Sequence, residues 1–509
     1  MESNELKVDI VIDPALRVAE VNRRLFGSFV EHMGRCVYGG VYEPGHPTAD
    51  ETGLRGDVLE LTRELGVTVV RYPGGNFVSS YRWEDGVGPV GERPKRLNLA
   101  WRTPESNAFG LNEFMTWARA AHAEPMMTVN LGTRGVQEAV DLLEYCNYPA
   151  GTQLSDLRRK HGVEQPHGIK LWCLGNEMDG PWQVGQKTPQ EYGRLAAETA
   201  KAMRLVDPSI ELVAVGSSNS DMPTFGEWES TLLEHAYDHV DYVSLHHYFD
   251  PGRPDFLASG VVMDRFIEDV IATCDYVAAK HRKKKRIQLS FDEWNVWYVH
   301  QFTEPADRDW LLPGDEAATQ APLIEDDFTA TDAVVVGDLL ISLLRHADRV
   351  TIANQAQLVN VIAPIRTTPQ GPAWRQSIFH PFALTSRLAR GDVLRVDPRG
   401  PVHATEQHGD VPTVSAVATH GEDETVLFAV NRAEQPAELR IDLRALDGYE
   451  FAGHACLAGS THTNTPEHPD RVQPRRVPTS TVTSGRVTVR LPAVSWNALR
   501  FTTPPHERG

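Results

Sequence analysis

The sequence predicts an α/β protein in which a (β/α)8 TIM barrel is followed by a C-terminal antiparallel β-sandwich of jelly-roll-like type. Two observations predict this fold class. Between about residues 20 and 380, a short apolar run rich in β-forming residues is followed by a helical pattern eight times, and eight such units close a barrel. After about residue 385, short alternating runs are separated by polar and Pro-rich turns, which is typical of a sandwich. A doubly wound sheet is the alternative, but no Gly-rich phosphate loop follows the first strand.

The eight expected barrel strands are apolar on both faces, as strands covered by helices are. They lie within residues 24–32, 67–76, 124–135, 169–180, 210–220, 240–250, 286–295 and 349–357. The helical patterns between them include residues 56–66, 111–123, 191–207 and 264–282. The N-terminal strand 6–13 alternates like the sandwich strands and has no helix of its own, so we expect it to pair into the sandwich. The expected domains are 19–384 for the catalytic barrel and 1–18 plus 385–509 for the sandwich.

The composition argues against several classes of partner. A formal net charge of -19 repels nucleic acid and anionic membrane surfaces, and no apolar run reaches the roughly 20 residues of a membrane span. The longest such run, residues 333–344, contains Asp338 and is expected to form an amphipathic or buried helix. The basic run 280–286 follows an apolar helical segment, and we interpret it as a solvated helix end. Five scattered cysteines and the lack of a secretory signal favour a reducing, cytoplasmic location.

Polar residues stand at the strand ends that lead into the following helices. In a barrel these ends share one face, which is the face that carries active sites. We therefore expect the following residues to converge there: Glu31, Asn76, Asn130, Asn176, Glu177, His246, Tyr248, Glu293 and Gln357.

Two of these strand ends carry adjacent pairs with a glutamate. The fourth strand ends in Asn176-Glu177 and the seventh in Asp292-Glu293. Two carboxyl groups on one rim can hydrolyse a glycoside, since one donates a proton to the leaving oxygen and the other attacks the anomeric carbon. A separation of roughly 5 to 5.5 Å would mean a retaining mechanism and roughly 6.5 to 9.5 Å an inverting one, and the sequence leaves this open.

Tryptophans accompany the two glutamates. Indole rings stack on sugars and exclude water, although a tryptophan is more often part of the core. The tryptophans near the two acids in the sequence are Trp172, Trp182, Trp294 and Trp297.

Long strings of the sequence resemble glycoside hydrolase family 51, the intracellular-type α-L-arabinofuranosidases. The strings are FGSFVEHMGRCVYGGVYEPGHP, RYPGGNFVSSYRWEDGVGP, WCLGNEMDGPWQ and LSFDEWNVWY, and the similarity spans nearly the whole chain. The resemblance implies a retaining exo-acting enzyme in which Glu177 is the general acid/base and Glu293 the nucleophile. It also implies that Glu31, Asn76, Asn176, Tyr248 and Gln357 hold the arabinofuranosyl ring, with Gln355 an adjacent candidate, and that Arg71 supports the nucleophile.

The remaining site expectations concern sugar contacts and metals. Trp182 and Trp297 are expected near the sugar, and His246 is expected to bond a hydroxyl group or a catalytic glutamate. His246 and His247 point to opposite faces of a strand, so we expect no metal site and no cofactor.

Two other functions were considered. A non-catalytic carbohydrate-binding relative could lose either glutamate, and this chain has both. An endo-acting β-1,4-glycanase of the same clan would need long aromatic subsites. The expected partners are arabinofuranosyl oligosaccharides, and the resemblance suggests a homo-oligomer, often a hexamer. The long loop 300–325 is expected to border the substrate cleft.

Overall fold

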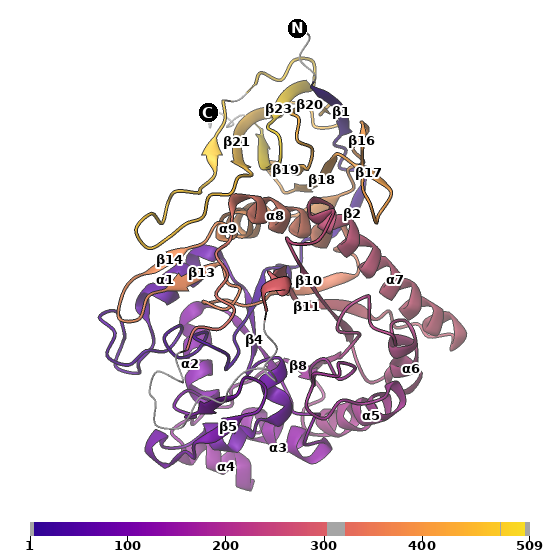
Figure 1. Cartoon of the computed structure of the whole chain (residues 1–509). Coiled ribbons are helices and arrows are strands. Elements are labelled where there is room, and N and C mark those ends of the chain that lie inside the picture. Colours follow the sequence, from indigo (N-terminus) through magenta and orange to yellow (C-terminus); the bar gives the residue numbers. More distant parts are fainter. Residues whose placement is uncertain (1–4, 303–320, 479, 504–509) are drawn as a thin grey trace, which may run out of the picture.

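A closed eight-stranded parallel barrel forms the centre of the molecule (Figure 1). The computed structural model describes residues 5–302, 321–478 and 480–503. Around the barrel the strands run in the order β10, β11, β12, β3, β4, β7, β8, β9. Their bounds are β3 (Gly27–Phe29), β4 (Val69–Tyr72), β7 (Glu124–Thr128), β8 (Leu171–Leu174), β9 (Glu211–Ala214), β10 (Tyr242–Phe249), β11 (Gln288–Val296) and β12 (Val350–Gln355). The barrel prediction and its eight strands are confirmed.

Helices follow the strands and cover the outside of the barrel. The α-helices are α1 (Gly56–Leu65), α2 (Leu111–Ala121), α3 (Val136–Asn147), α4 (Gln153–Lys160), α5 (Pro189–Val206), α6 (Glu227–Ala236), α7 (Ser259–Lys280), α8 (Ala330–Arg345) and α9 (Phe379–Leu388). Short 3-10 helices occupy η1 (Arg23–Leu25), η2 (Asn76–Ser80), η3 (Trp83–Gly86), η4 (Val90–Glu92), η5 (Phe256–Ala258) and η6 (Val299–Gln301). Helix α5 shows how the sequence fixes a start, because Thr188 and Glu191 form a capping box around Pro189.

The C-terminal region forms a β-sandwich above the barrel (Figure 1). One sheet has the order β2, β15, β18, β19, β24, β21, β22 and the other the order β1, β20, β23. The strands are β1 (Leu6–Val11), β2 (Arg17–Glu20), β15 (Asp392–Leu394), β18 (Val414–His420), β19 (Glu424–Asn431), β20 (Ala437–Asp442), β21 (Glu450–Ala458), β22 (Arg475–Arg476), β23 (Arg486–Leu491) and β24 (Ser495–Thr502). Strand β1 pairs with β20, as predicted for the N-terminal strand, and this one pairing is parallel.

Three two-stranded hairpins complete the described strands, and the sequence patterns did not predict them. They are β5 (Arg96–Asn98) with β6 (Thr103–Glu105), β13 (Ile365–Thr367) with β14 (Ala373–Arg375), and β16 (Val402–Ala404) with β17 (Asp410–Pro412). Each strand has only three residues. That is too short for an alternating pattern to become visible.

Helix α8 lies between the barrel and the sandwich (Figure 1). The apolar run 333–344 falls inside it and is entirely buried, which confirms the expected buried helix. Its one charged residue, Asp338, accepts a hydrogen bond from Arg432 of the sandwich at 2.8 Å, and both side chains are 2% exposed. Within the described parts of the chain, no helix is both long enough and apolar enough to cross a membrane.

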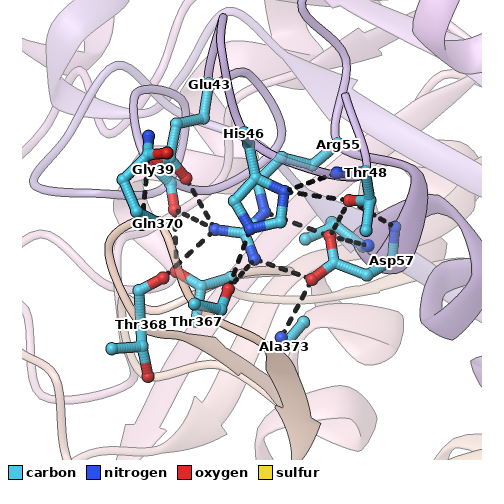
Figure 2. Close-up of polar contacts among 12 residues, drawn as sticks. Gly39, Glu43, His46, Thr48, Arg55, Asp57, Thr367, Thr368, Gln370 and Ala373 are labelled. Carbon is cyan, nitrogen blue, oxygen red and sulfur yellow. Dashed lines mark hydrogen bonds and ion pairs between the residues drawn. The ribbon is translucent and has the colours of Figure 1, made fainter. Parts of the chain in front are cut away.

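A buried arginine joins the loop after β3 to the β13–β14 hairpin (Figure 2). The Arg55 guanidinium donates to the carboxylates of Glu43 and Asp57, each at 2.7 Å, and to the carbonyl of Gly371, also at 2.7 Å. The hydroxyl of Thr367 in β13 donates to the Gly39 carbonyl of the same loop at 2.7 Å. These contacts fix two segments that flank the barrel face on which the predicted site residues lie.

Candidate active site

A pocket of about 860 Å³ opens at the carboxyl ends of the barrel strands. Eight of the predicted site residues line it: Glu31, Asn76, Glu177, Trp182, Tyr248, Glu293, Trp297 and Gln357. Three others, Arg71, Asn176 and His246, are at most 2% exposed and lie behind this lining. The structure therefore brings the predicted residues together in two layers, one that faces the pocket and one that supports it.

Glu293 receives a donor on each carboxylate oxygen. Arg71 Nη1 lies 2.6 Å from Oε1, and the hydroxyl of Tyr248 donates to Oε2 at 2.8 Å. The second guanidinium nitrogen of Arg71 donates to Asn176 Oδ1 at 2.8 Å. Donors and a fixed positive charge favour the ionised carboxylate. The arrangement therefore holds Glu293 as an anion that faces the pocket.

Glu177 lies at the end of β8 in a different environment. Trp182 Nε1 donates to Oε2 at 2.7 Å, and Nδ1 of His246 lies 3.0 Å from Oε1. Burial and the negative charge of Glu293 raise the pKa of Glu177, while the bonds to His246 and Trp182 oppose the shift. Its backbone φ is +42°, in the left-handed region that residues other than glycine rarely adopt. The chain thus holds this side chain in a strained turn to present it to the pocket.

His246 connects Glu177 to a third carboxylate. Its Nε2 lies 2.9 Å from Asp292 Oδ1, so both ring nitrogens face a carboxylate oxygen. Burial alone lowers the pKa of His246, but the charge of Glu293 and the bonds to Asp292 and Glu177 together raise it to about 10. Both ring nitrogens of His246 contact carboxylates, so the ring supports Glu177 and Asp292 and has no nitrogen left for a sugar hydroxyl. Of the two roles expected from the sequence, the geometry favours the contact with a catalytic glutamate.

The two carboxyl groups are close together. One oxygen of Glu177, one oxygen of Glu293 and one ring nitrogen of His246 all lie within 4.8 Å of one another. Such a close approach of the nearest oxygens fits the carboxyl separation of roughly 5 to 5.5 Å that is typical of retaining glycosidases. The same three atoms form a set that a cation can use as ligands, but Arg71 already provides positive charge at 2.6 Å from Glu293.

Glu31 forms the opposite wall with three donors. The backbone N–H of Phe77 and the indole N–H of Trp101 donate to Oε1 at 2.9 and 3.1 Å, and Gln357 Nε2 donates to Oε2 at 3.1 Å. Burial first, and then the charge of Glu293, raise the pKa of Glu31 to about 7 despite these donors. The alternative glutamine, Gln355, bonds Asn295 away from the pocket, so the geometry favours Gln357.

Gly74 and Gly75, which follow β4, let the backbone pass close to the side chains of Glu31 and Glu293. A Cβ on Gly74 would lie 2.5 Å from Glu31 Cγ, and one on Gly75 would lie 3.0 Å from Glu293 Oε1. Gly74 also has a φ of +153°. Only glycine fits such approaches without displacing the carboxylates. This glycine turn at the barrel rim is thus part of the site.

Some expectations about neighbouring residues need correction. Trp172 and Trp294 are fully buried in the core, because on each strand they point away from the face that carries the acids. Asn130 turns into its own loop and bonds Tyr81 and Thr133. None of these three residues lines the pocket.

One further residue contributes to the site without a signal in the sequence. Trp101, in the turn of the β5–β6 hairpin, lines the pocket and bonds Glu31. Nothing in the local pattern distinguishes this tryptophan from a core residue. Of the long loop 300–325, residues 303–320 lie outside the described residues, and Phe302 and Ile324 at its ends line the pocket.

A barrel that presents two carboxylates at this spacing, one supported by an arginine and one beside a histidine, is typical of glycoside hydrolases that use paired acids. Residues 61–258 match the family description "Alpha-L-arabinofuranosidase 1 domain", and residues 292–495 match "Alpha-L-arabinofuranosidase C-terminal domain".

Curated proteins and solved structures agree with this class. The chain is 55% identical to the intracellular exo-α-(1→5)-L-arabinofuranosidase of Streptomyces lividans, over 97% of this chain and 75% of that protein. It is 52% identical to the exo-α-(1→6)-L-arabinofuranosidase of Bifidobacterium longum, over 96% of both. The solved family 51 α-L-arabinofuranosidase AbfB of Bifidobacterium longum superposes with a TM-score of 0.92 at 47% identity, over 97% of this chain and 99% of that one. The chain belongs to the family 51 α-L-arabinofuranosidases.

Proposed function

We propose that this chain is a retaining, exo-acting α-L-arabinofuranosidase that removes terminal α-L-arabinofuranosyl residues from the non-reducing ends of arabino-oligosaccharides and of arabinoxylan or arabinan fragments. The observation that carries the proposal is the approach of Glu177 and Glu293 within 4.8 Å in one pocket. Membership of the family supports the identity of the sugar.

In the first step Glu293 is the nucleophile. One of its oxygens forms a bond to the anomeric carbon while the glycosidic bond breaks, and Glu177 gives its proton to the departing oxygen. Arg71 and Tyr248 keep Glu293 ionised and aimed at the pocket before the attack. The product of this step is a covalent glycosyl-enzyme and a released alcohol.

The proton for this step belongs to the pair of Glu177 and His246. The indole N–H of Trp182 donates to Glu177 Oε2, so this oxygen acts as an acceptor and does not carry the proton. The proton is therefore shared across the 3.0 Å contact between Glu177 Oε1 and His246 Nδ1. Either Glu177 donates to a neutral ring, or an imidazolium donates to the carboxylate. Asp292 on the far nitrogen stabilises the imidazolium form. The histidine therefore acts as a positioning residue and proton store for the acid.

In the second step Glu177 becomes the base. Once Glu293 is esterified its negative charge is gone, so of the two causes that raise the pKa of Glu177 only burial remains, and the pKa of Glu177 falls. The carboxylate can then take a proton from water, which attacks the anomeric carbon and frees Glu293. Glu31, Asn76, Gln357 and Trp101 enclose the ring on the other side and hold it during both steps.

The finer properties rest on relatives. The two relatives named above are assigned to (1→5) and (1→6) linkages, so identity near 50% leaves the linkage of this chain open. We propose that it acts in the cytoplasm on short oligosaccharides, as the word intracellular in the name of the Streptomyces lividans relative suggests. We also propose a homo-oligomer, which light scattering during size-exclusion chromatography would test.

The deciding experiment compares initial rates on 4-nitrophenyl α-L-arabinofuranoside, β-D-xylopyranoside and β-cellobioside under the same conditions. The proposal expects release from the arabinofuranoside alone. Release mainly from the cellobioside would move the assignment to an endo-glycanase, and no release from any of them would indicate a binding protein.

A second experiment distinguishes the role of Glu177 from that of Glu293. Glu177→Ala should still form the glycosyl-enzyme from the 4-nitrophenyl substrate, because that leaving group needs little protonation, and added azide should restore turnover. An equal loss on every substrate without an azide product would contradict the role assigned to Glu177.

A further inference from the structure

The pocket extends well beyond the space that a single furanose ring requires. Its volume of about 860 Å³ is at the upper end of the range for sites that enclose drug-sized ligands, roughly 300 to 1,000 Å³. The lining continues from the carboxylates to Gln407 and His408, which lie in the turn of the β16–β17 hairpin in the C-terminal region rather than in the barrel. This second part of the pocket has no place in the two steps described above.

The order of strands around the barrel divides the pocket into two sides. Asn76, Glu31 and Gln357 follow the neighbouring strands β4, β3 and β12 and enclose one side. The other side follows β8, β9 and β10 and carries Glu177 and Trp182, then residues 218–222, then residues 253–256. Because the acid must touch the leaving oxygen, the leaving sugar lies on the side of β8 to β10.

The β16–β17 hairpin ends at the far limit of this second side. Its tip is tied to the barrel through backbone atoms, since Gln407 N donates to Asp255 Oδ2 and Arg265 Nη2 donates to the His408 carbonyl, both at 2.9 Å. Arg265 lies in α7, and Figure 1 shows the hairpin at the edge of the sandwich beside this helix. The anchoring therefore fixes the tip in place without using its side chains.

The side chains of Gln407 and His408 remain available for a ligand. Among the described residues, no hydrogen bond joins either side chain to another group. Between them and the acid, the lining offers Asn219, Ser220 and Arg253, while Trp182, 45% exposed, offers an indole face. Amides, hydroxyls and an aromatic plane suit sugar hydroxyl groups and ring faces.

We propose that the tip of the β16–β17 hairpin binds a neutral pentose oligosaccharide on the leaving-group side of the cleaved bond, so that this hairpin of the C-terminal region contributes a distal sugar subsite. The proposal rests on the proposed function and specifies the length of its substrate. Sugars beyond the first leaving residue reach Gln407 and His408, whereas a small aryl leaving group does not.

The test is the double variant Gln407→Ala/His408→Ala, with Glu406→Ala as its control, because Glu406 is exposed on the same tip and does not line the pocket. Specificity constants are measured on 4-nitrophenyl α-L-arabinofuranoside, α-1,5-arabinobiose, α-1,5-arabinotetraose and an arabinosylated xylotetraose. The unaltered enzyme should prefer the longer substrates to the biose. In the double variant, the specificity constant should fall about tenfold on one or both of the longer substrates, which is the size expected for the loss of two neutral hydrogen bonds. On the aryl substrate and the biose it should fall less than twofold.

Each other pattern overturns the subsite. Unchanged specificity constants on both longer oligosaccharides would show that the hairpin tip does not contact substrate. An equal loss on all four substrates would show that it acts through the fold, and a melting temperature equal to that of the control variant excludes loss of folding as the cause. Whichever of the two longer oligosaccharides is affected identifies the backbone, arabinan-like or xylan-like. Failure of the proposed function is a separate result, since the unaltered enzyme would then be inactive on the aryl arabinofuranoside.

Discussion

Replacing Glu31 with glutamine should stabilise the folded protein above neutral pH while it weakens the enzyme. Glu31 is 3% exposed, and its pKa is about 7 in the folded chain against the usual 4.5. The unfolded chain therefore loses this proton at a lower pH than the folded chain. The stability that the proton provides is complete below pH 4.5 and is lost as the pH rises towards 7.

The size of the change in the free energy of unfolding follows from the pKa shift of Glu31. A difference of 7 - 4.5 = 2.5 units corresponds to about 3 kcal/mol at pH 8, whereas at pH 5 the same calculation leaves less than about 1 kcal/mol. Glutamine resembles the neutral form at every pH and avoids this cost. Gln357 can accept the new amide by a flip, because its own Oε1 has no hydrogen-bond partner in the described structure. The variant should thus gain about 2 to 3 kcal/mol more at pH 8 than at pH 5.

Thermal unfolding at pH 5 and pH 8 measures this difference. For a cooperative unit of roughly 370 residues, the unfolding entropy is about 0.8 kcal/mol/K, so the variant's extra gain in melting temperature at pH 8 should be about 3 °C. The exposed Glu51→Gln is the matched control and should show no such dependence. Equal melting temperatures of Glu31→Gln and the unaltered protein at pH 8, or a gain that is larger at pH 5, would refute the reasoning.

Three further changes test other parts of the site. Gly75→Ala should lower kcat about 100-fold, because the new methyl group would lie 3.0 Å from the nucleophilic oxygen of Glu293, and its melting temperature should stay close to that of the unaltered protein. Retained activity would contradict the close approach. Asp292→Asn removes a negative charge from His246, so the basic limb of kcat/KM on a poor leaving group should move about one unit to lower pH, and a shift upwards would contradict the shared proton. Arg55→Met leaves Glu43 buried without its partner and should destabilise by about 3 to 5 kcal/mol in denaturant unfolding; adding Glu43→Gln should recover part of it, and an additive loss would argue against the pairing.

The barrel and the two acids could be predicted from the sequence because each depends on a local pattern. Every barrel strand is a continuous apolar run with polar residues at its end, and barrel topology then places Glu177 beside Glu293 without further information. The supporting layer behind them was only partly predictable. Arg71 was inferred from resemblance, whereas the contact of Asp292 with His246 depends on the register of β10 against β11, which no local pattern contains.

The parts that could not be predicted are those that enter the site from short hairpins. Trp101 and the pair Gln407 and His408 lie in the turns of hairpins whose strands have three residues each, where neither hydrophobic alternation nor a turn motif marks a side chain that faces a pocket. Their position is set by distant anchors, such as the bond from Arg265 to the His408 carbonyl. Residues that grip substrate from loops carry no signal of their own in one sequence.

The charges of the site explain why the two glutamates can differ although each is buried at a strand end. Within hydrogen-bond reach, Glu293 has an arginine that is positive at every working pH and the hydroxyl of Tyr248, which donates to it, so both partners suit a carboxylate anion. Glu177 has an imidazole that can either give or take a proton, held by Asp292 on the other side. A fixed partner yields a nucleophile and a titratable partner yields an acid that can become a base. The same strand-end position thus takes either role, and the residue behind it decides which.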